Sequence, residues 1–346
     1  MTAEAGPPLL AEAPSRLAAA ARVAVKVLIS AAIVWILLTR IPVAEVGRAL
    51  RSVNAAFLLL AFALVPLYNY VAAAQQRVLT DHQGLALGTA RILEINIASH
   101  FYGLFLPGYL AGGVLRWYRM SRGGKAIAAL AAIAVNRLLE VVTLLLFGAV
   151  MWLVANPPGA NAALTAFMLG ALVGTAAVVA TLFHGGAADR MSTLLSTKRS
   201  RWIPARAREK LAATCSAVAR FGTIPARESA RLTSLLLLRH ALEFASFVLL
   251  AWAVGIHLSL PDLGWIRSFM ALALMLPITY AGIGVRETTL LVTMQPYGVA
   301  AESAVALSVL LLARNLLGAL AGGVWELKRV LRGSRGGGAL ISSERA

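Results

Sequence analysis

Long runs of apolar residues alternate with short polar links along most of the chain. A helix needs about 20 apolar residues to cross the hydrocarbon of a bilayer. The run from Ala126 to Ala155 contains only Arg137 and Glu140 as charged residues, so it predicts a spanning helix. By the same pattern we expect uninterrupted spanning helices at residues 20–39, 55–76, 126–154, 162–183, 232–254 and 303–326.

Two further apolar stretches, residues 91–120 and 264–297, are interrupted by proline and glycine. Proline lacks an N–H group and clashes with the preceding helical turn. Glycine lets the backbone turn sharply. Each stretch is therefore predicted to contain a broken helix. The expected fold is all-α and polytopic, with about eight hydrophobic segments in a single transmembrane domain, residues 20–330.

Charge adds an orientation to this picture. The chain is 59% hydrophobic and 14% charged, whereas soluble domains carry about a quarter charged residues, which argues against a soluble catalytic domain. The net charge is +17, and basic residues flank the start of the first helix (Arg16, Arg22 and Lys26), fill residues 184–231 and recur from Lys328 into the tail. The positive-inside rule places both termini and the 184–231 loop in the cytoplasm of a bacterial-type inner membrane. We expect residues 331–346 to be disordered and no nucleic-acid binding.

This orientation makes both broken segments re-entrant. The flanking helices put the two ends of 91–120 on the cytoplasmic side and the two ends of 264–297 on the outside. Non-helical backbone at membrane depth is tolerated only inside protein or beside a wet cavity. The alternative is that each segment is a full crossing with a polar end.

The two broken segments also resemble each other. Residues 106–116 and 276–286 align without a gap, and Leu, Pro, Ala, Gly and Arg match at the same offsets. Inverted repeats with broken helices are typical of transporters, whose substrate sites lie at the repeat interface. The predicted breaks or hinges are Pro107, Gly108, Gly112, Pro277, Gly282 and Gly284.

Ionisable residues at membrane depth cost about 2.5–3.5 kcal/mol on insertion scales, so each is a functional candidate. A planar guanidinium binds phosphate oxygens in bidentate fashion. The candidate lipid-phosphate contacts are Arg116, Arg137, Arg286 and Arg314. Their candidate polar or charged supports are Asn96, Glu140, Glu243 and Glu287.

Spacing suggests how some of these residues pair. Arg137 and Glu140 are three apart and share a helix face; they are either a lipid contact with its support or a self-neutralising structural pair. Depth alone suggests Glu243 as the partner of Arg314. Arg286 and Glu287 are adjacent and should point apart.

The remaining chemistry is sparse. His240 is expected to be hydrogen-bonded within the bundle. The single cysteine excludes a disulfide within the chain, and we expect no metal and no cofactor. The glycine pairs 170/174 and 318/322 have a spacing that predicts close helix packing.

Three motifs give the chain a family resemblance. They are Phe105-Leu106-Pro107-Gly108 with Arg116, then Asn136-Arg137 with Glu140, and then Leu276-Pro277 followed by Gly282-Ile283-Gly284-Val285-Arg286-Glu287. From about residue 20 to 330 the chain resembles the lysylphosphatidylglycerol synthase transmembrane-region family. Relatives often place a Gly-Glu pair before the first arginine, where this chain has Tyr109 to Gly113.

The resemblance implies the flippase portion of enzymes that make and export aminoacylated phosphatidylglycerol, without their soluble aminoacyl-transferase domain. It therefore implies lipid movement and not lipid synthesis. We expect a non-enzymatic protein that moves an anionic lipid, or a polyprenyl-phosphate-linked headgroup, between leaflets. The alternatives are a membrane-embedded enzyme that modifies lipid headgroups, and a scaffold that binds lipid-synthesis enzymes through residues 184–231.

Overall fold

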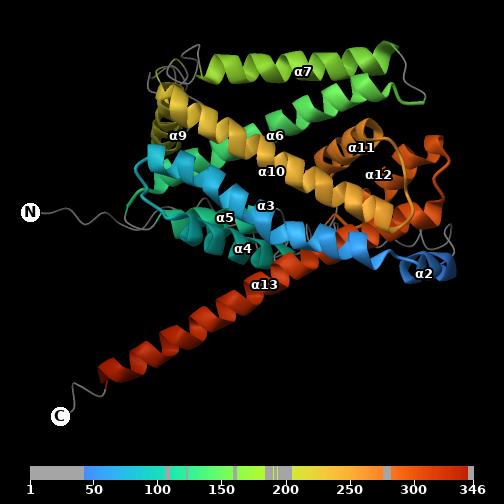
Figure 1. Ribbon diagram of the computed structural model, residues 1–346. Helices are drawn as coiled ribbons and strands as arrows, with labels where there is room; N and C mark the ends of the chain where they lie inside the picture. The colour runs from blue at the N-terminus through green and yellow to red at the C-terminus, as the bar shows by residue number, and fades with distance from the viewer. Residues whose placement is uncertain are drawn as a thin grey trace, which may run out of the picture.

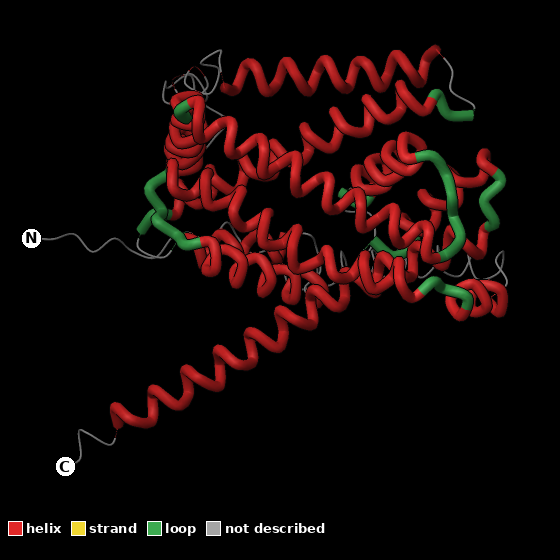
Figure 2. Tube along the Cα trace, viewed as in Figure 1, coloured by secondary structure: helices red, strands yellow, loops and turns green. Residues whose placement is uncertain are grey.

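A computed structural model describes residues 43–105, 110–121, 124–158, 162–183, 190, 193, 205–275 and 282–341. Within these ranges the chain forms helices joined by short links and has no strand (Figure 2), as predicted. The helix predicted at 20–39, the segment 1–19 and the break residues Pro107, Gly108 and Pro277 lie outside the described residues.

Long helices dominate the described part of the chain. In chain order the elements are α2 (Val43–Arg51), α3 (Ala55–His82), α4 (Thr89–Phe105), α5 (Leu110–Met120), α6 (Ala126–Ala155), α7 (Ala162–Phe183), α9 (Ala205–Ala219), the 3₁₀ turn η1 (Arg220–Thr223), α10 (Ala226–Ala253), α11 (Leu260–Ala273), α12 (Val285–Met294), the 3₁₀ turn η2 (Gln295–Tyr297) and α13 (Ala301–Ile341). Helices α3, α6, α10 and the Ala301–Glu326 part of α13 are long and apolar enough to cross a membrane. The total of about eight hydrophobic segments stays a prediction.

The exterior of the bundle is also apolar. Leu59 is 69% exposed, Val173 is 67% exposed and Val154 is 64% exposed. Large exposed apolar surfaces are rare on soluble monomers and mark surfaces that contact membrane or protein. The helix lengths and the apolar exterior together describe a membrane protein.

Helices α3 and α10 form the central pair (Figure 1). The Asn54 N–H donates to the Ala253 carbonyl at 2.9 Å, and the Ser246 hydroxyl donates to the Ala61 carbonyl at 3.1 Å. Near the other end of the pair, Val78 and Leu232 belong to one buried cluster. The two helices therefore run antiparallel and side by side along their whole length.

The first broken segment folds as two helices that pack on each other, α4 and α5. Arg77, near the end of α3, donates to Thr89 at the start of α4 at 3.5 Å. Trp117, near the end of α5, donates to the Ala126 carbonyl at the start of α6 at 2.9 Å. The segment thus begins and ends at the same end of the bundle (Figure 1).

The second broken segment has the same form at the opposite end of the bundle. Helices α11 and α12 pack on each other. The Tyr297 hydroxyl, just after α12, donates to Asp262 at 2.6 Å and accepts from the Trp265 indole at 3.1 Å. Burial raises the pKa of the Tyr297 phenol, and the hydrogen bond to Asp262 adds to this effect. The start of α11 and the end of α12 are therefore fixed together.

The matching sequences of the two segments do not give matching local structure. Gly282 and Gly284 precede α12 with φ of +73° and +91°, a region that favours glycine. A Cβ on Gly282 would also lie 2.5 Å from the Leu274 side chain. Gly112, which aligns with Gly282, instead lies inside helix α5, so its predicted role as a break is wrong. The inverted repeat stays a prediction.

Helix is more extensive than the sequence pattern predicted. Helix α13 continues to Ile341, where disorder was expected from residue 331. Helix α9 lies inside the stretch expected to be a loop, and α10 begins at Ala226 rather than at residue 232. Adding a residue to an existing helix is far easier than starting one. Helices α10 and α13, which contain apolar spans, therefore continue into polar residues that the hydrophobic pattern could not assign to a helix.

Close packing at glycine is found at Gly322 of the predicted pair 318/322, whereas a Cβ on Gly318 would meet no atom within 4 Å among the described residues. A Cβ on Gly322 of α13 would overlap the Ile97 carbonyl oxygen of α4, so this crossing requires glycine. A Cβ on Gly170 or Gly174 of α7 would meet no atom within 4 Å in the described part of the chain, and close packing at that pair stays a prediction.

Candidate functional site

A chain of alternating charges crosses the middle of the bundle. The Arg239 guanidinium of α10 bonds Glu140 of α6 on one side and Glu243 of α10, at 2.9 Å, on the other. The second oxygen of Glu243 accepts from Arg267 of α11 at 2.7 Å. Positive and negative groups thus alternate across α6, α10 and α11.

Helix geometry and burial explain why these charged side chains pair with one another. Arg239 and Glu243 are four residues apart, so they share a face of α10. Their side chains are 19% and 22% exposed, and that of Arg267 is 9% exposed. In surroundings with little water each ion pair is much stronger than at a surface, and each unpaired charge is more costly.

Polar residues extend the chain toward α3. Glu140 accepts from the Asn136 amide at 2.8 Å, and the Asn136 oxygen accepts from Gln75 of α3 at 3.0 Å. Arg137 donates to the other oxygen of Glu140 at 3.2 Å, with its side chain 42% exposed. The predicted pairing of Arg137 with Glu140 on one helix face is therefore confirmed.

Arg314 does not pair with Glu243, so that prediction is wrong. Its guanidinium donates to the Ser246 hydroxyl of α10 at 3.2 Å. Both oxygens of Glu243 are already occupied by Arg239 and Arg267. Depth along a helix does not reveal which face a residue occupies, and here the nearer cation comes from α11.

Arg267, Arg286 and Arg314 each have buried N–H groups with no hydrogen-bond partner in the described structure. The unpartnered nitrogens are Nη1 of Arg267, Nε of Arg314, and Nε and Nη2 of Arg286. Arg314 lies within Coulombic reach of both other arginines. Leaving a buried donor unsatisfied costs about 1–3 kcal/mol, and more for a charged group. This arrangement suits an anion with several acceptor oxygens.

Arg286 is almost fully buried, at 2% exposed, in the first turn of α12. Glu287 beside it accepts from the Gly284 N–H and from the Ser308 hydroxyl, both at 2.6 Å. Glu287 therefore caps α12 and ties it to α13. Contrary to our expectation, Arg286 Nε approaches Glu287 Oε1, but at 3.9 Å this is an ion pair without a hydrogen bond.

The α4–α5 hairpin holds two more predicted residues, Arg116 and Asn96. Arg116 of α5 lies within Coulombic reach of Glu140 and of His100 on α4. Asn96 of α4 is 7% exposed, and its side-chain oxygen has no hydrogen-bond partner in the described structure. The hairpin thus places Arg116 near Glu140 and buries Asn96.

His240 departs from expectation. It is 7% exposed on α10, but neither ring nitrogen has a hydrogen-bond partner in the described structure. The predicted hydrogen bond within the bundle is therefore wrong.

Sequence reasoning missed three charged residues. Arg239 stands one turn before Glu243, a spacing that could have identified the pair. Arg267 stands alone in the apolar start of the second broken segment, which is itself a signal. Arg119 of α5 pairs with Glu326 of α13 at 2.7 Å, with side chains 6% and 8% exposed. The long separation of that pair in sequence gave no signal.

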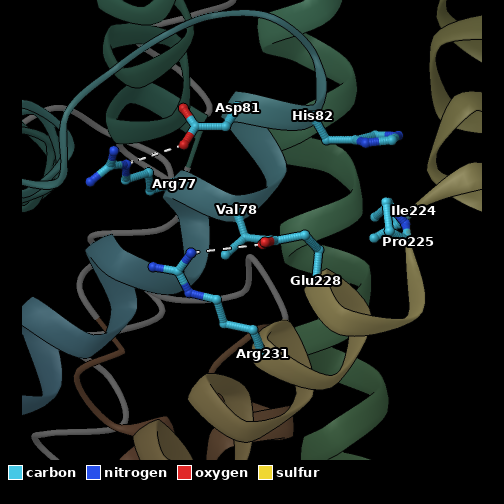
Figure 3. A pocket seen from close by; sticks show the side chains of 8 residues that line it. All are labelled: Arg77, Val78, Asp81, His82, Ile224, Pro225, Glu228 and Arg231. Atoms are coloured by element: carbon cyan, nitrogen blue, oxygen red, sulfur yellow. Dashed lines mark hydrogen bonds and ion pairs between the residues drawn. The ribbon is translucent and has the colours of Figure 1, made fainter.

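A cavity of about 270 Å³ opens where α3 ends and α10 begins (Figure 3). It contains two ion pairs, Arg77 with Asp81 at 3.1 Å and Arg231 with Glu228 at 3.7 Å. Arg231 precedes Arg239 by eight residues, which is about 12 Å along a helix. The cavity therefore lies at one end of the α3–α10 pair, and the charged chain lies near its middle.

No cluster of three His, Cys, Asp or Glu residues that could hold a metal occurs within the described ranges. A search of curated proteins finds no match to this chain. The family model for the lysylphosphatidylglycerol synthase TM region matches residues 23–323, which is most of the chain. The protein therefore belongs to the lysylphosphatidylglycerol synthase transmembrane-region family.

Proposed function

We propose that this protein moves a lipid with an anionic phosphate headgroup, including a polyprenyl-phosphate lipid, between the leaflets of a bacterial-type inner membrane. The observation that supports this most directly is the group formed by Arg267, Arg286 and Arg314, whose buried N–H groups have unmet hydrogen bonds. Family membership supports a role in lipid handling.

The chemistry of the headgroup explains why arginines are needed. A phosphate that leaves water loses its hydration, which is costly unless other donors replace it. Charge-assisted hydrogen bonds from guanidinium to phosphate are short and about twice as strong as neutral ones. Arg267, Arg314 and Arg286 would supply these donors in the bundle, while the acyl or prenyl tails stay in lipid along the apolar exterior.

The two broken segments would bring this site to the membrane midplane. With the positive-inside orientation, α4–α5 would enter from the cytoplasm and α11–α12 from the outside, with both termini cytoplasmic. The N-terminus of α12 would add free backbone N–H groups that favour an anion. The cavity beside Arg77 and Arg231 would be the first position for a headgroup on the cytoplasmic side.

The hydrogen bonds made by the three partly buried glutamates favour transport over catalysis. A general base needs a carboxylate that can accept a proton from substrate. Glu140 and Glu243 are both held by arginines, and Glu287 is held by the Gly284 N–H and the Ser308 hydroxyl. We therefore propose that the protein is not an enzyme and that these acids position the arginines.

Leaflet exchange tests the proposal. Purified protein is placed in vesicles with fluorescent phosphatidylglycerol, and a membrane-impermeant quencher reports how fast inner-leaflet lipid reaches the outer leaflet. Wild type is compared with Arg314→Gln and Arg286→Gln, and with Arg227→Gln as a control, because Arg227 is exposed and lies outside the cavity lining.

The expected result is rapid exchange in wild type and in the Arg227 variant, and loss of exchange in the other two. Equal exchange in all four folded proteins would remove the arginines from the lipid path. A lack of exchange in folded wild type, with phosphatidylglycerol and with a polyprenyl-phosphate lipid, would contradict the proposed function.

A further inference from the structure

We infer that His240 binds a proton when the phosphate headgroup binds, so that lipid uptake and proton uptake are linked. This inference rests on the proposed function and adds a second ligand to the same site. It starts from an imidazole that is buried beside the charged chain yet has no hydrogen-bond partner in the described structure on either ring nitrogen.

His240 lies on α10 beside the charged residues Arg239 and Glu243. It directly follows Arg239 and lies one turn before Glu243 on α10. It is also within Coulombic reach of Arg267 and Glu140. A neutral imidazole has one N–H donor and one acceptor nitrogen, and both are normally satisfied when the ring is buried. Here both are left for a ligand or a proton.

The helices around α10 contribute further titratable or charged groups. Tyr68 of α3 lies within reach of Glu243, Arg239, Arg267 and Arg314. His100 of α4 lies within reach of Arg239, Glu140 and Glu243. The charged groups within Coulombic reach of His240 itself are Arg239, Arg267, Glu140 and Glu243, and Arg314 lies within reach of Tyr68.

These groups set the direction of the linkage. Around the imidazole, the charges of Arg239 and Arg267 balance those of Glu140 and Glu243. A proton on His240 would therefore add an unbalanced positive charge to a buried site, which is costly. A bound phosphodiester carries one negative charge, which lowers that cost. By linkage, protonation of His240 must then strengthen phosphate binding by the same factor.

In the proposed linkage the proton moves together with the lipid. It would pass from water on the loading side to a free ring nitrogen of His240, and the resulting imidazolium would donate a hydrogen bond to a phosphate oxygen. On release of the lipid at the other leaflet the ring would return its proton to water. The loaded site would then carry less unbalanced charge than either ligand alone would produce, which lowers the cost of burial.

The test is lipid binding as a function of pH. Detergent-purified full-length protein is titrated with short-chain phosphatidylglycerol by calorimetry, from about pH 5.5 to about pH 8.5, which spans the usual range of histidine titration. The phosphodiester keeps its single charge throughout this range. Each titration is repeated in two buffers of different ionisation enthalpy, so that proton uptake by wild type is measured directly and without a variant.

In wild type we expect proton uptake on binding, and a Kd that rises by up to about tenfold per pH unit above the His240 titration. His240→Gln should still bind, with no pH dependence and no proton uptake. His257→Gln is the matched control, because this exposed histidine lies in the link before α11; it should behave as wild type. His100→Gln tests the second imidazole and should also keep the pH dependence.

The outcomes separate the two proposals. Binding by wild type with no proton uptake would overturn the linkage and leave the proposed function standing. Proton uptake that persists in His240→Gln, or that disappears in His100→Gln alone, would also overturn the assignment to His240. No binding of phosphatidylglycerol at any pH by folded wild type would overturn the proposed function, and the linkage with it.

Discussion

Replacing Glu243 by glutamine should destabilise the protein more than any single change at an exposed ion pair. Glu243 accepts from Arg239 at 2.9 Å and from Arg267 at 2.7 Å, and these two hydrogen bonds join α10 to α11. Arg239 would keep Glu140 as a partner. Arg267, with its side chain 9% exposed, would lose the carboxylate it pairs with. Breaking a buried ion pair by removing one partner costs about 3–5 kcal/mol.

The partial exposure of Glu243, at 22%, favours the lower end of that range, about 3 kcal/mol. For a large domain this corresponds to a fall in Tm of about 5–10 °C, measured by thermal unfolding of purified protein in detergent. Glu228→Gln is the matched control, because its pair with Arg231 is 41% and 58% exposed and is worth about 0–1 kcal/mol.

A double variant tests whether the lost stability comes from leaving Arg267 without its acid. In Glu243→Gln with Arg267→Met no guanidinium is left without an acid, because Arg239 keeps Glu140 and the cation that would lose its partner has been removed. The double variant should recover most of the lost stability. A single Glu243→Gln variant as stable as the Glu228→Gln control would refute the stabilising role of the charged chain.

Three further changes probe the helix contacts. Glu326→Gln should lower stability by about 3 kcal/mol in thermal unfolding, because it leaves the 7%-exposed Arg119 without its acid; an unchanged Tm would show that this pair does not hold α5 to α13. Gly322→Ala should cost about 1–3 kcal/mol, because its Cβ would overlap the Ile97 carbonyl, whereas Gly174→Ala, with open space around it, should cost nothing and serves as the control. Asn54→Ala should cost about 1 kcal/mol, because Asn54 caps α3 by accepting from two backbone N–H groups; replacement by Asp should retain most of that stability.

The long helices were predictable because a membrane imposes a length and a composition on each span. The predicted segments 126–154 and 162–183 agree with α6 and α7 to within a residue at each end. The ends of α10 and α13 were not predictable in this way. There the helix continues into polar sequence, where apolar content gives no signal and cooperative extension decides.

The site was predictable in part. A charge inside an apolar run is visible in sequence, and this identified Arg137, Glu140, Glu243, Arg286 and Arg314. Which charges meet depends on helix rotation and on contacts between distant segments. For that reason the sequence assigned Arg314 to Glu243, whereas the structure places Arg267 there.

The repeat shows the same limit in another form. Gly112 and Gly282 occupy matching positions in the alignment, yet one is helical and the other has a positive φ. Gly282 adopts that backbone against Leu274, a contact that the aligned residues alone do not encode. Matching residues therefore predicted where the chain is broken only to within about a helical turn.

The central claim is that Arg267, Arg286 and Arg314 together bind a phosphate headgroup, and ligand-induced stabilisation tests it most directly. A ligand at 100 times its Kd stabilises the folded state by about 2.7 kcal/mol. Short-chain phosphatidylglycerol should therefore raise the Tm of wild type, while the matching diacylglycerol, which has no phosphate, should not. This rise should be lost in Arg314→Gln and in Arg286→Gln. An equal rise in wild type and in both variants would contradict the claim.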